Sequence, residues 1–234
     1  MRRQWRSVWV LLVLIATIAI PADAQENPEN ELGTWFIYNG TLRFSDRWSL
    51  FTDGQLRLWE PIGNLEEVLL RAAGHYDINP KMTVGLGVLH TNVWPVEGSA
   101  GDGRTRSEDR IYQQFVYRHR WGRAFVEHRF RFEQRWLDYF YETEFATRER
   151  YRFQITFPIN NTKLVPGTNF VNIYNEFFVN QGGEPSLEQN RLYAAWGRKF
   201  THQATLQLGL LWQHRSPGDF FRLQVFYTHN FDFR

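Results

Sequence analysis

The sequence predicts an all-β fold, an antiparallel transmembrane up-and-down β-barrel of about 10–12 strands. Three observations support this prediction: charged and apolar residues alternate over long segments, most segments have 11 to 14 residues, and the connections alternate between short and long. Alternation with a period of two puts successive side chains on opposite faces, as in a β-strand. Strands of this length exceed the roughly 5–6 residues usual in globular sheets and suffice to cross a bilayer.

The first 24 residues, 1–24, have the pattern of a cleavable export signal. An arginine-rich start precedes an apolar run of 13 residues, Val8–Ile20, and Ala22-Asp23-Ala24 forms an A-x-A cleavage site. The apolar run is shorter than the roughly 20 residues that a membrane-spanning helix needs. We therefore expect residues 25–234 to form a barrel domain that is exported to the outer membrane of a Gram-negative bacterium.

Composition excludes several classes of function. Without the signal, which holds three arginines and Asp23, the formal net charge falls from +2 to 0. A neutral chain has no electrostatic basis for binding nucleic acid, and the absence of cysteine excludes disulfides and thiolate metal sites. Aromatic residues make up 17% of the chain, and Trp and Tyr concentrate at membrane–water boundaries.

Eleven segments are expected to form strands. In chain order they are Leu32–Arg43, Trp48–Trp59, Glu67–Asp77, Met82–Trp94, Glu108–Arg118, Arg123–Trp136, Thr147–Phe157, Asn169–Gln181, Gln189–Lys199, Ala204–His214 and Phe220–Phe231. Because bacterial barrels normally have an even number of strands, the odd count leaves 10 and 12 open as well.

The connections between these segments are expected to differ at the two ends of the barrel. Short turns are predicted at Ser45-Asp46, Ile78-Asn79-Pro80, Trp121-Gly122, Asn160-Asn161 and Thr201-His202. Longer polar loops are predicted at Pro61–Glu66, Pro95–Ser107, Leu137–Ala146, Gly182–Glu188 and Arg215–Asp219. Outer-membrane barrels have short periplasmic turns and longer loops outside.

The polar face of the alternation predicts a charged lumen. Within Phe125–Trp136, charged residues occupy the odd positions and mostly apolar residues the even ones. In a membrane barrel the apolar face meets lipid and the charged face meets the lumen. The residues expected to form an ion-pair network there are Arg57, Glu67, Arg71, Arg110, Glu127, Arg129, Arg131, Glu133, Arg135, Arg148, Arg150, Arg152, Glu176 and Arg191. Since unpaired buried charges are costly, we expect pairing that largely plugs the lumen, with a narrow charged channel as the alternative.

Several short motifs recur in a recognisable order along nearly all of the mature chain. They are Trp35, Gln55-Leu56-Arg57, Glu108-Asp109-Arg110 with Gln113-Gln114, Arg129-x-Arg131-x-Glu133-Gln134-Arg135, Arg148-x-Arg150-x-Arg152, Tyr174-Asn175-Glu176-Phe177-Phe178-Val179-Asn180 and Glu188-Gln189-Asn190-Arg191. This layout resembles domain-of-unknown-function family 2490, a group of uncharacterised outer-membrane β-barrel proteins. The resemblance implies a barrel and its location, and it implies no activity.

One tripeptide, His214-Arg215-Ser216, is a candidate for catalysis. A His beside a Ser can act as general base for acyl transfer, and the pattern is similar to the His-x-Ser of outer-membrane phospholipase A and lipid A deacylases. Those enzymes continue with Asn where this chain has Pro217, and Asp219 is expected to stand too near in the sequence to serve as the third residue. The histidines lack the spacing of a zinc site, so we expect no metal and no cofactor.

These observations leave three functions open. We expect an outer-membrane barrel without enzymatic activity that serves structure, surface interaction or narrow transport. The alternatives are a lipid acyl hydrolase that uses His214 and Ser216, and a soluble periplasmic or secreted all-β binding protein. The partners expected for the barrel are outer-membrane lipids, lipopolysaccharide and the barrel-assembly machinery during insertion; no nucleic acid is expected, and the oligomeric state is open.

Overall fold

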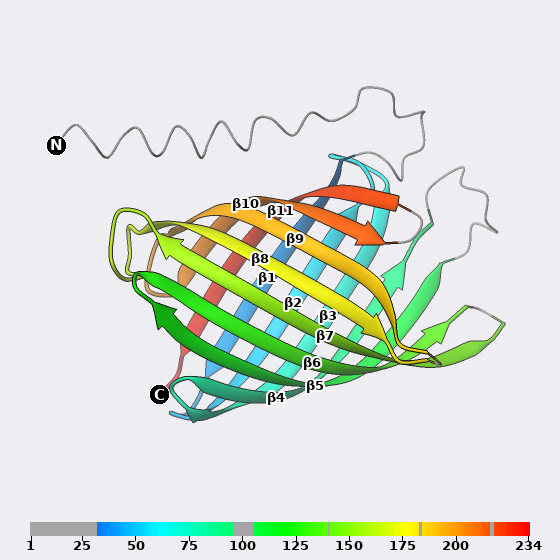
Figure 1. The fold of residues 1–234 in the computed structure, drawn as a ribbon, viewed down its shortest axis with the longest axis horizontal. Coiled ribbons are helices and arrows are strands. Elements are labelled where there is room, and N and C mark those ends of the chain that lie inside the picture. Colours follow the sequence, from blue (N-terminus) through cyan, green and yellow to red (C-terminus); the bar gives the residue numbers. More distant parts are fainter. Residues whose placement is uncertain (1–31, 96–104, 140, 183, 216–217) are drawn as a thin grey trace.

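The computed structural model describes residues 32–95, 105–139, 141–182, 184–215 and 218–234, so the predicted export signal lies outside the described residues. Eleven strands form one closed barrel, which confirms the all-β barrel prediction (Figure 1). They are β1 (Gly33–Arg43), β2 (Trp48–Leu58), β3 (Leu65–Asn79), β4 (Met82–Val93), β5 (Arg106–Trp121), β6 (Ala124–Asp138), β7 (Thr143–Pro158), β8 (Asn169–Asn180), β9 (Ser186–Lys199), β10 (Ala204–Arg215) and β11 (Gly218–Asp232). Within the described ranges no helix has the length and apolar character needed to cross a membrane.

The barrel closes through a parallel pair of strands. Ten neighbouring pairs are antiparallel, whereas β1 pairs with β11 in parallel from Gly33↔Arg222 to Arg43↔Asp232. With an odd number of alternating strands the first and the last run in the same direction, so only a parallel pair can close the ring. The seam is the one departure from the antiparallel arrangement that the sequence predicts.

Beyond the last strand, the C-terminal residue ties the seam to a neighbouring turn. Arg234 donates hydrogen bonds to Asp232 at 2.6 and 2.8 Å and to Asp46, in the β1–β2 turn, at 2.9 Å. Hydrogen bonds to these two carboxylates raise the pKa of Arg234. Exposed pairs of this kind contribute little to stability, but they fix the direction in which the chain leaves β11.

Apolar side chains cover the outside of the barrel. In β6 the outward Phe130, Phe132 and Trp136 are 50%, 37% and 37% exposed, while Arg131 and Glu133 are only 4% and 0% exposed. A soluble sheet protein shows the reverse arrangement, with its apolar face buried. The period-two pattern therefore separates an apolar outer wall from a charged inner wall.

The connections after odd-numbered strands lie at one end of the barrel, the turn end, and those after even-numbered strands lie at the other, the loop end. Three lengths differ from expectation. The predicted longer loop Arg215–Asp219 is reduced to two residues, 216–217, between β10 and β11. The predicted short turn Asn160-Asn161 belongs to a ten-residue connection, 159–168, in which both asparagine side chains bond to main-chain or hydroxyl groups. The predicted loop Leu137–Ala146 shrinks to 139–142, because β6 and β7 remain paired past Trp136, whose ring packs 5.4 Å from that of Phe145.

An apolar cluster fills one side of the interior. It is formed by β1 and β8–β10 and consists of Trp35, Ile37, Tyr174, Tyr193, Ala195 and Leu211, with Phe226 of β11 packed against it. The rings of Tyr174 and Tyr193 stack at 4.8 Å. Charged residues of β2–β7 face this cluster, so the lumen has one apolar and one charged wall.

Candidate functional site

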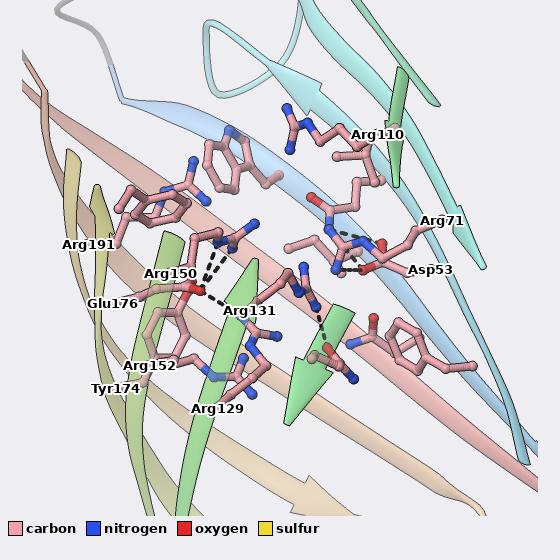
Figure 2. A pocket seen from close by; sticks show the side chains of 18 of the residues that line it. Asp53, Arg71, Arg110, Arg129, Arg131, Arg150, Arg152, Tyr174, Glu176 and Arg191 are labelled. Carbon is pink, nitrogen blue, oxygen red and sulfur yellow. Dashed lines mark hydrogen bonds and ion pairs between the residues drawn. The ribbon is translucent and has the colours of Figure 1, made fainter. Parts of the chain in front are cut away.

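The candidate site is a cavity of about 510 Å³ inside the barrel, lined by side chains from all eleven strands. Figure 2 shows 18 of the lining residues, and seven of the ten that it labels are arginines that point into the cavity. Among the described residues, fourteen arginines and eight carboxylates line it, so arginines are in excess by six. The whole chain has a formal net charge of only +2, so the positive charge is concentrated in the interior.

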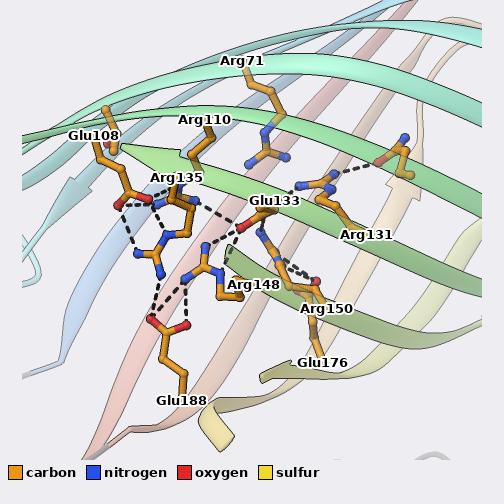
Figure 3. A network of polar contacts seen from close by, with 12 residues as sticks. Arg71, Glu108, Arg110, Arg131, Glu133, Arg135, Arg148, Arg150, Glu176 and Glu188 are labelled. Atoms are coloured by element: carbon orange, nitrogen blue, oxygen red, sulfur yellow. Dashed lines mark hydrogen bonds and ion pairs between the residues drawn. The ribbon is translucent and has the colours of Figure 1, made fainter. Parts of the chain in front are cut away.

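Near the loop end, Glu108 anchors one part of a polar network (Figure 3). Its side chain is 1% exposed and accepts hydrogen bonds from Nε of Arg110 and Nε of Arg135, each at 2.6 Å. Glu188 lies 3.3 Å from Arg135 and 3.0 Å from Arg148. The network thus links β5, β6, β7 and β9 across the lumen.

Glu133 is the centre of the network. It is fully buried and accepts hydrogen bonds from Arg148 at 2.6 and 2.9 Å and from Arg150 at 2.7 Å. Arg131 and Arg110 lie farther off, at 3.6 and 3.9 Å. One carboxylate therefore contacts four arginines, since it has about four lone-pair sites, but its single negative charge balances only one positive charge.

Toward the turn end the network continues through two more carboxylates. Glu176 lies 2.7 Å from Arg129 and 2.9 Å from Arg150. Glu127 lies 2.6 Å from Arg152 and 2.9 Å from Arg118, which is half exposed. These contacts tie β5, β6, β7 and β8 together.

A second group of pairs lies on β2 and β3. Arg57 pairs with Glu67, which also accepts a hydrogen bond from Thr91 at 2.7 Å. Arg71 lies 3.3 Å from Asp53. The guanidinium of Arg57 also lies over the ring of Trp35 at 3.9 Å, which joins this group to the apolar wall.

All fourteen residues predicted for the lumen have side chains on the inner wall, and thirteen of them take part in ion pairs. The fourteenth, Arg191, has no carboxylate partner among the described residues; its guanidinium lies over Trp35 and Phe178 at 5.0 and 4.7 Å.

Sequence reasoning missed several carboxylates of the network, among them Asp53, Glu66, Glu108 and Glu188. Asp53 and Glu108 share the parity of inward neighbours in their own strands, which is a signal that could have found them. Glu66 and Glu188 lie where the β2–β3 and β8–β9 pairings shift register, so a simple period of two misplaces them.

His214, the first residue of the candidate catalytic tripeptide, lies on the outer wall at the loop end. His214 is exposed and shares a hydrogen bond of 2.6 Å between its Nδ1 and Oδ1 of Asp219. The expectation that Asp219 is too near in the sequence is wrong, because the tight β10–β11 hairpin places the two residues directly opposite each other. Ser216 lies outside the described residues. The described part of the chain contains no group of three His, Cys, Asp or Glu side chains that could hold a metal ion.

The family model described as "Protein of unknown function (DUF2490)" matches residues 32–222, which is most of the chain and nearly all of the barrel. No curated protein matches the chain, and no solved structure matches it.

Proposed function

We propose that this chain, which belongs to the DUF2490 family of proteins of unknown function, is an outer-membrane barrel whose lumen gives small charged solutes a restricted passage. The observation that supports this most directly is the charged cavity of about 510 Å³ within a closed barrel that is apolar outside. A closed barrel satisfies every main-chain hydrogen bond within the sheet, as a lipid environment requires.

The outer wall supports the membrane location. Large apolar side chains such as Leu70, Leu86 and Val88 are 57–61% exposed and lie on adjacent strands. Soluble monomers rarely expose contiguous apolar patches larger than a few hundred Å². Surrounding lipids, including lipopolysaccharide in the outer leaflet, are the partners that would cover this wall in the proposed setting.

The inner wall supports passage of small solutes only. The ion-pair network and the apolar cluster both project into the lumen and narrow it. Barrels of eight strands are filled by side chains, and those of about 16 hold aqueous channels, so eleven strands leave intermediate space. The excess of arginine would favour anions over cations through the electrostatic field of the wall.

Fractionation and conductance test this proposal. The mature protein should be recovered in the outer membrane, migrate differently on gels before and after boiling, and form small pores in planar bilayers. A potassium chloride gradient should give a reversal potential with the sign of anion selectivity. Recovery as a soluble periplasmic protein would contradict the location, and a correctly inserted barrel without conductance would contradict the passage.

The pair of His214 and Asp219 supports a second candidate, hydrolysis of lipid acyl esters at the outer wall. A carboxylate on Nδ1 orients a histidine for use as general base. Under this hypothesis Ser216→Ala abolishes lipid turnover in reconstituted protein, whereas Ser186→Ala, a matched change at the same end, leaves it intact. Equal products from the two variants would remove the hypothesis.

A further inference from the structure

The centre of the lumen holds more positive than negative charge. Five side chains define an inner arginine cluster that extends from β3, β6, β7 and β9 toward the cavity (Figure 2): Arg71, Arg129, Arg131, Arg150 and Arg191. Each belongs to the lining of the cavity. Because guanidinium groups remain protonated in proteins, all five carry a full charge.

Two carboxylates form ion pairs with arginines of this cluster and with no other arginine of the described residues. Glu176 lies 2.7 Å from Arg129 and 2.9 Å from Arg150. Asp53 lies 3.3 Å from Arg71. These contacts balance two of the five positive charges.

The third nearby carboxylate is already shared with an arginine outside the cluster. Glu133 lies 2.7 Å from Arg150 and 3.6 Å from Arg131, and it also lies 2.6 Å from Arg148. Its negative charge is therefore divided between the inner cluster and the network near the loop end. The inner arginine cluster keeps at least two positive charges that no carboxylate balances.

Two members of the cluster show this deficit directly. Arg131 is 4% exposed and donates to Gln114 at 2.8 Å, but its Nε and Nη1 atoms have no hydrogen-bond partner. Arg191 lies opposite Glu176 in the β8–β9 pairing without forming an ion pair with it; its guanidinium lies over the rings of Trp35 and Phe178, and its buried Nε is without an acceptor. Burying guanidinium nitrogens without hydrogen-bond acceptors is costly, so an anion from solution would complete the hydrogen bonding of these two side chains.

We propose that the inner arginine cluster binds an oxyanion, a small solute that bears a phosphate or carboxylate group. Planar guanidinium groups match such oxygens with two parallel hydrogen bonds. A cavity of about 510 Å³ falls within the range of small-molecule sites, about 300–1,000 Å³. The apolar wall beside Arg191 leaves room for the carbon part of an organic anion. This inference rests on the proposed function and deepens it by naming the class of solute.

Calorimetric titration of the purified, folded barrel in an uncharged detergent tests the inference. Inorganic phosphate and succinate are titrated separately at a constant ionic strength set with potassium chloride. We expect saturable binding of at least one of them, and the tighter of the two identifies phosphate or carboxylate as the preferred group. Arg131→Gln and Arg191→Gln should each weaken binding at least tenfold. Arg198→Gln, an exposed position on the outer side of the same strand as Arg191, should leave it unchanged.

Unfolding provides a second measurement. Arg131→Gln removes an unbalanced charge, so without phosphate or succinate its unfolding midpoint should be higher than that of the wild type. Addition of the anion should raise the midpoint of the wild type, and it should raise that of the variant by less. Absence of saturable binding of both probes, or binding that both variants leave intact, overturns the inference. Binding in detergent does not depend on conductance or location, so a failed titration and a failed pore assay are distinguishable.

Discussion

Glu133→Gln should cost the barrel a large part of its stability. The substitution keeps the shape of the side chain and removes its charge. The carboxylate is fully buried and accepts three charge-assisted hydrogen bonds, two from Arg148 and one from Arg150. Removing one partner of a buried ion pair costs about 3–5 kcal/mol, because the other charge stays buried without compensation. The equilibrium constant of unfolding should therefore rise by between about 100-fold and a few thousand-fold.

Urea unfolding of the barrel in detergent or lipid, followed by tryptophan fluorescence, measures this change. Glu149→Gln is the matched control: it lies on the outer side of β7, is exposed, and should change stability by less than about 0.5 kcal/mol. The double variant Glu133→Gln with Arg148→Gln should regain part of the loss, since it removes one of the uncompensated cations. If Glu133→Gln and Glu149→Gln unfold at the same urea concentration, the network does not stabilise the barrel and the reasoning from burial is refuted.

Two further predictions concern packing and closure. Gly87→Ala should destabilise the barrel by about 1–3 kcal/mol, because the added Cβ would lie 2.4 Å from the ring of Tyr112. Gly74→Ala is the control and should leave stability unchanged, because a Cβ there would meet no atom within 4 Å. The urea midpoints of the two variants measure the difference. Phe36→Cys with Val225→Cys, register partners across the parallel seam, should be joined by a short thiol cross-linker in a chain that has no other cysteine. An absence of cross-linking in the folded double variant would contradict the parallel closure.

The sequence predicts well which residues form the outer and the inner surface of the barrel, because the side of the sheet to which a side chain points is a local property of its strand. Alternation within β6 alone separates Phe130 from Arg131, and the structure places them on opposite faces. The seam is different. Which strand pairs with β1 depends on the number of strands and on closure of the whole ring, and no local pattern records either.

Partner choice within the lumen is equally hard to predict. Arg148 reaches Glu133 on the neighbouring strand and also Glu188, which lies 40 positions away along the chain. The second contact depends on a register shift between β8 and β9 that brings Glu188 inward. Periodicity gives the inward residues of the regular strand segments, but it misses those at register shifts and gives neither the pairs nor the surplus of cations.

Arginine and lysine are distributed differently over the molecule. Every cation that lines the cavity is an arginine, whereas the three lysines, Lys81, Lys163 and Lys199, lie in or beside the connections of the turn end. An ammonium group is more strongly hydrated than a guanidinium and loses more on leaving water. Arg148 also shows what lysine lacks, because its fork contacts Glu133 and Glu188 at the same time. Planar guanidinium groups of this kind hold the carboxylates of the lumen in fixed positions. Where arginines outnumber carboxylates, the same paired N–H donors are available to an anion from solution.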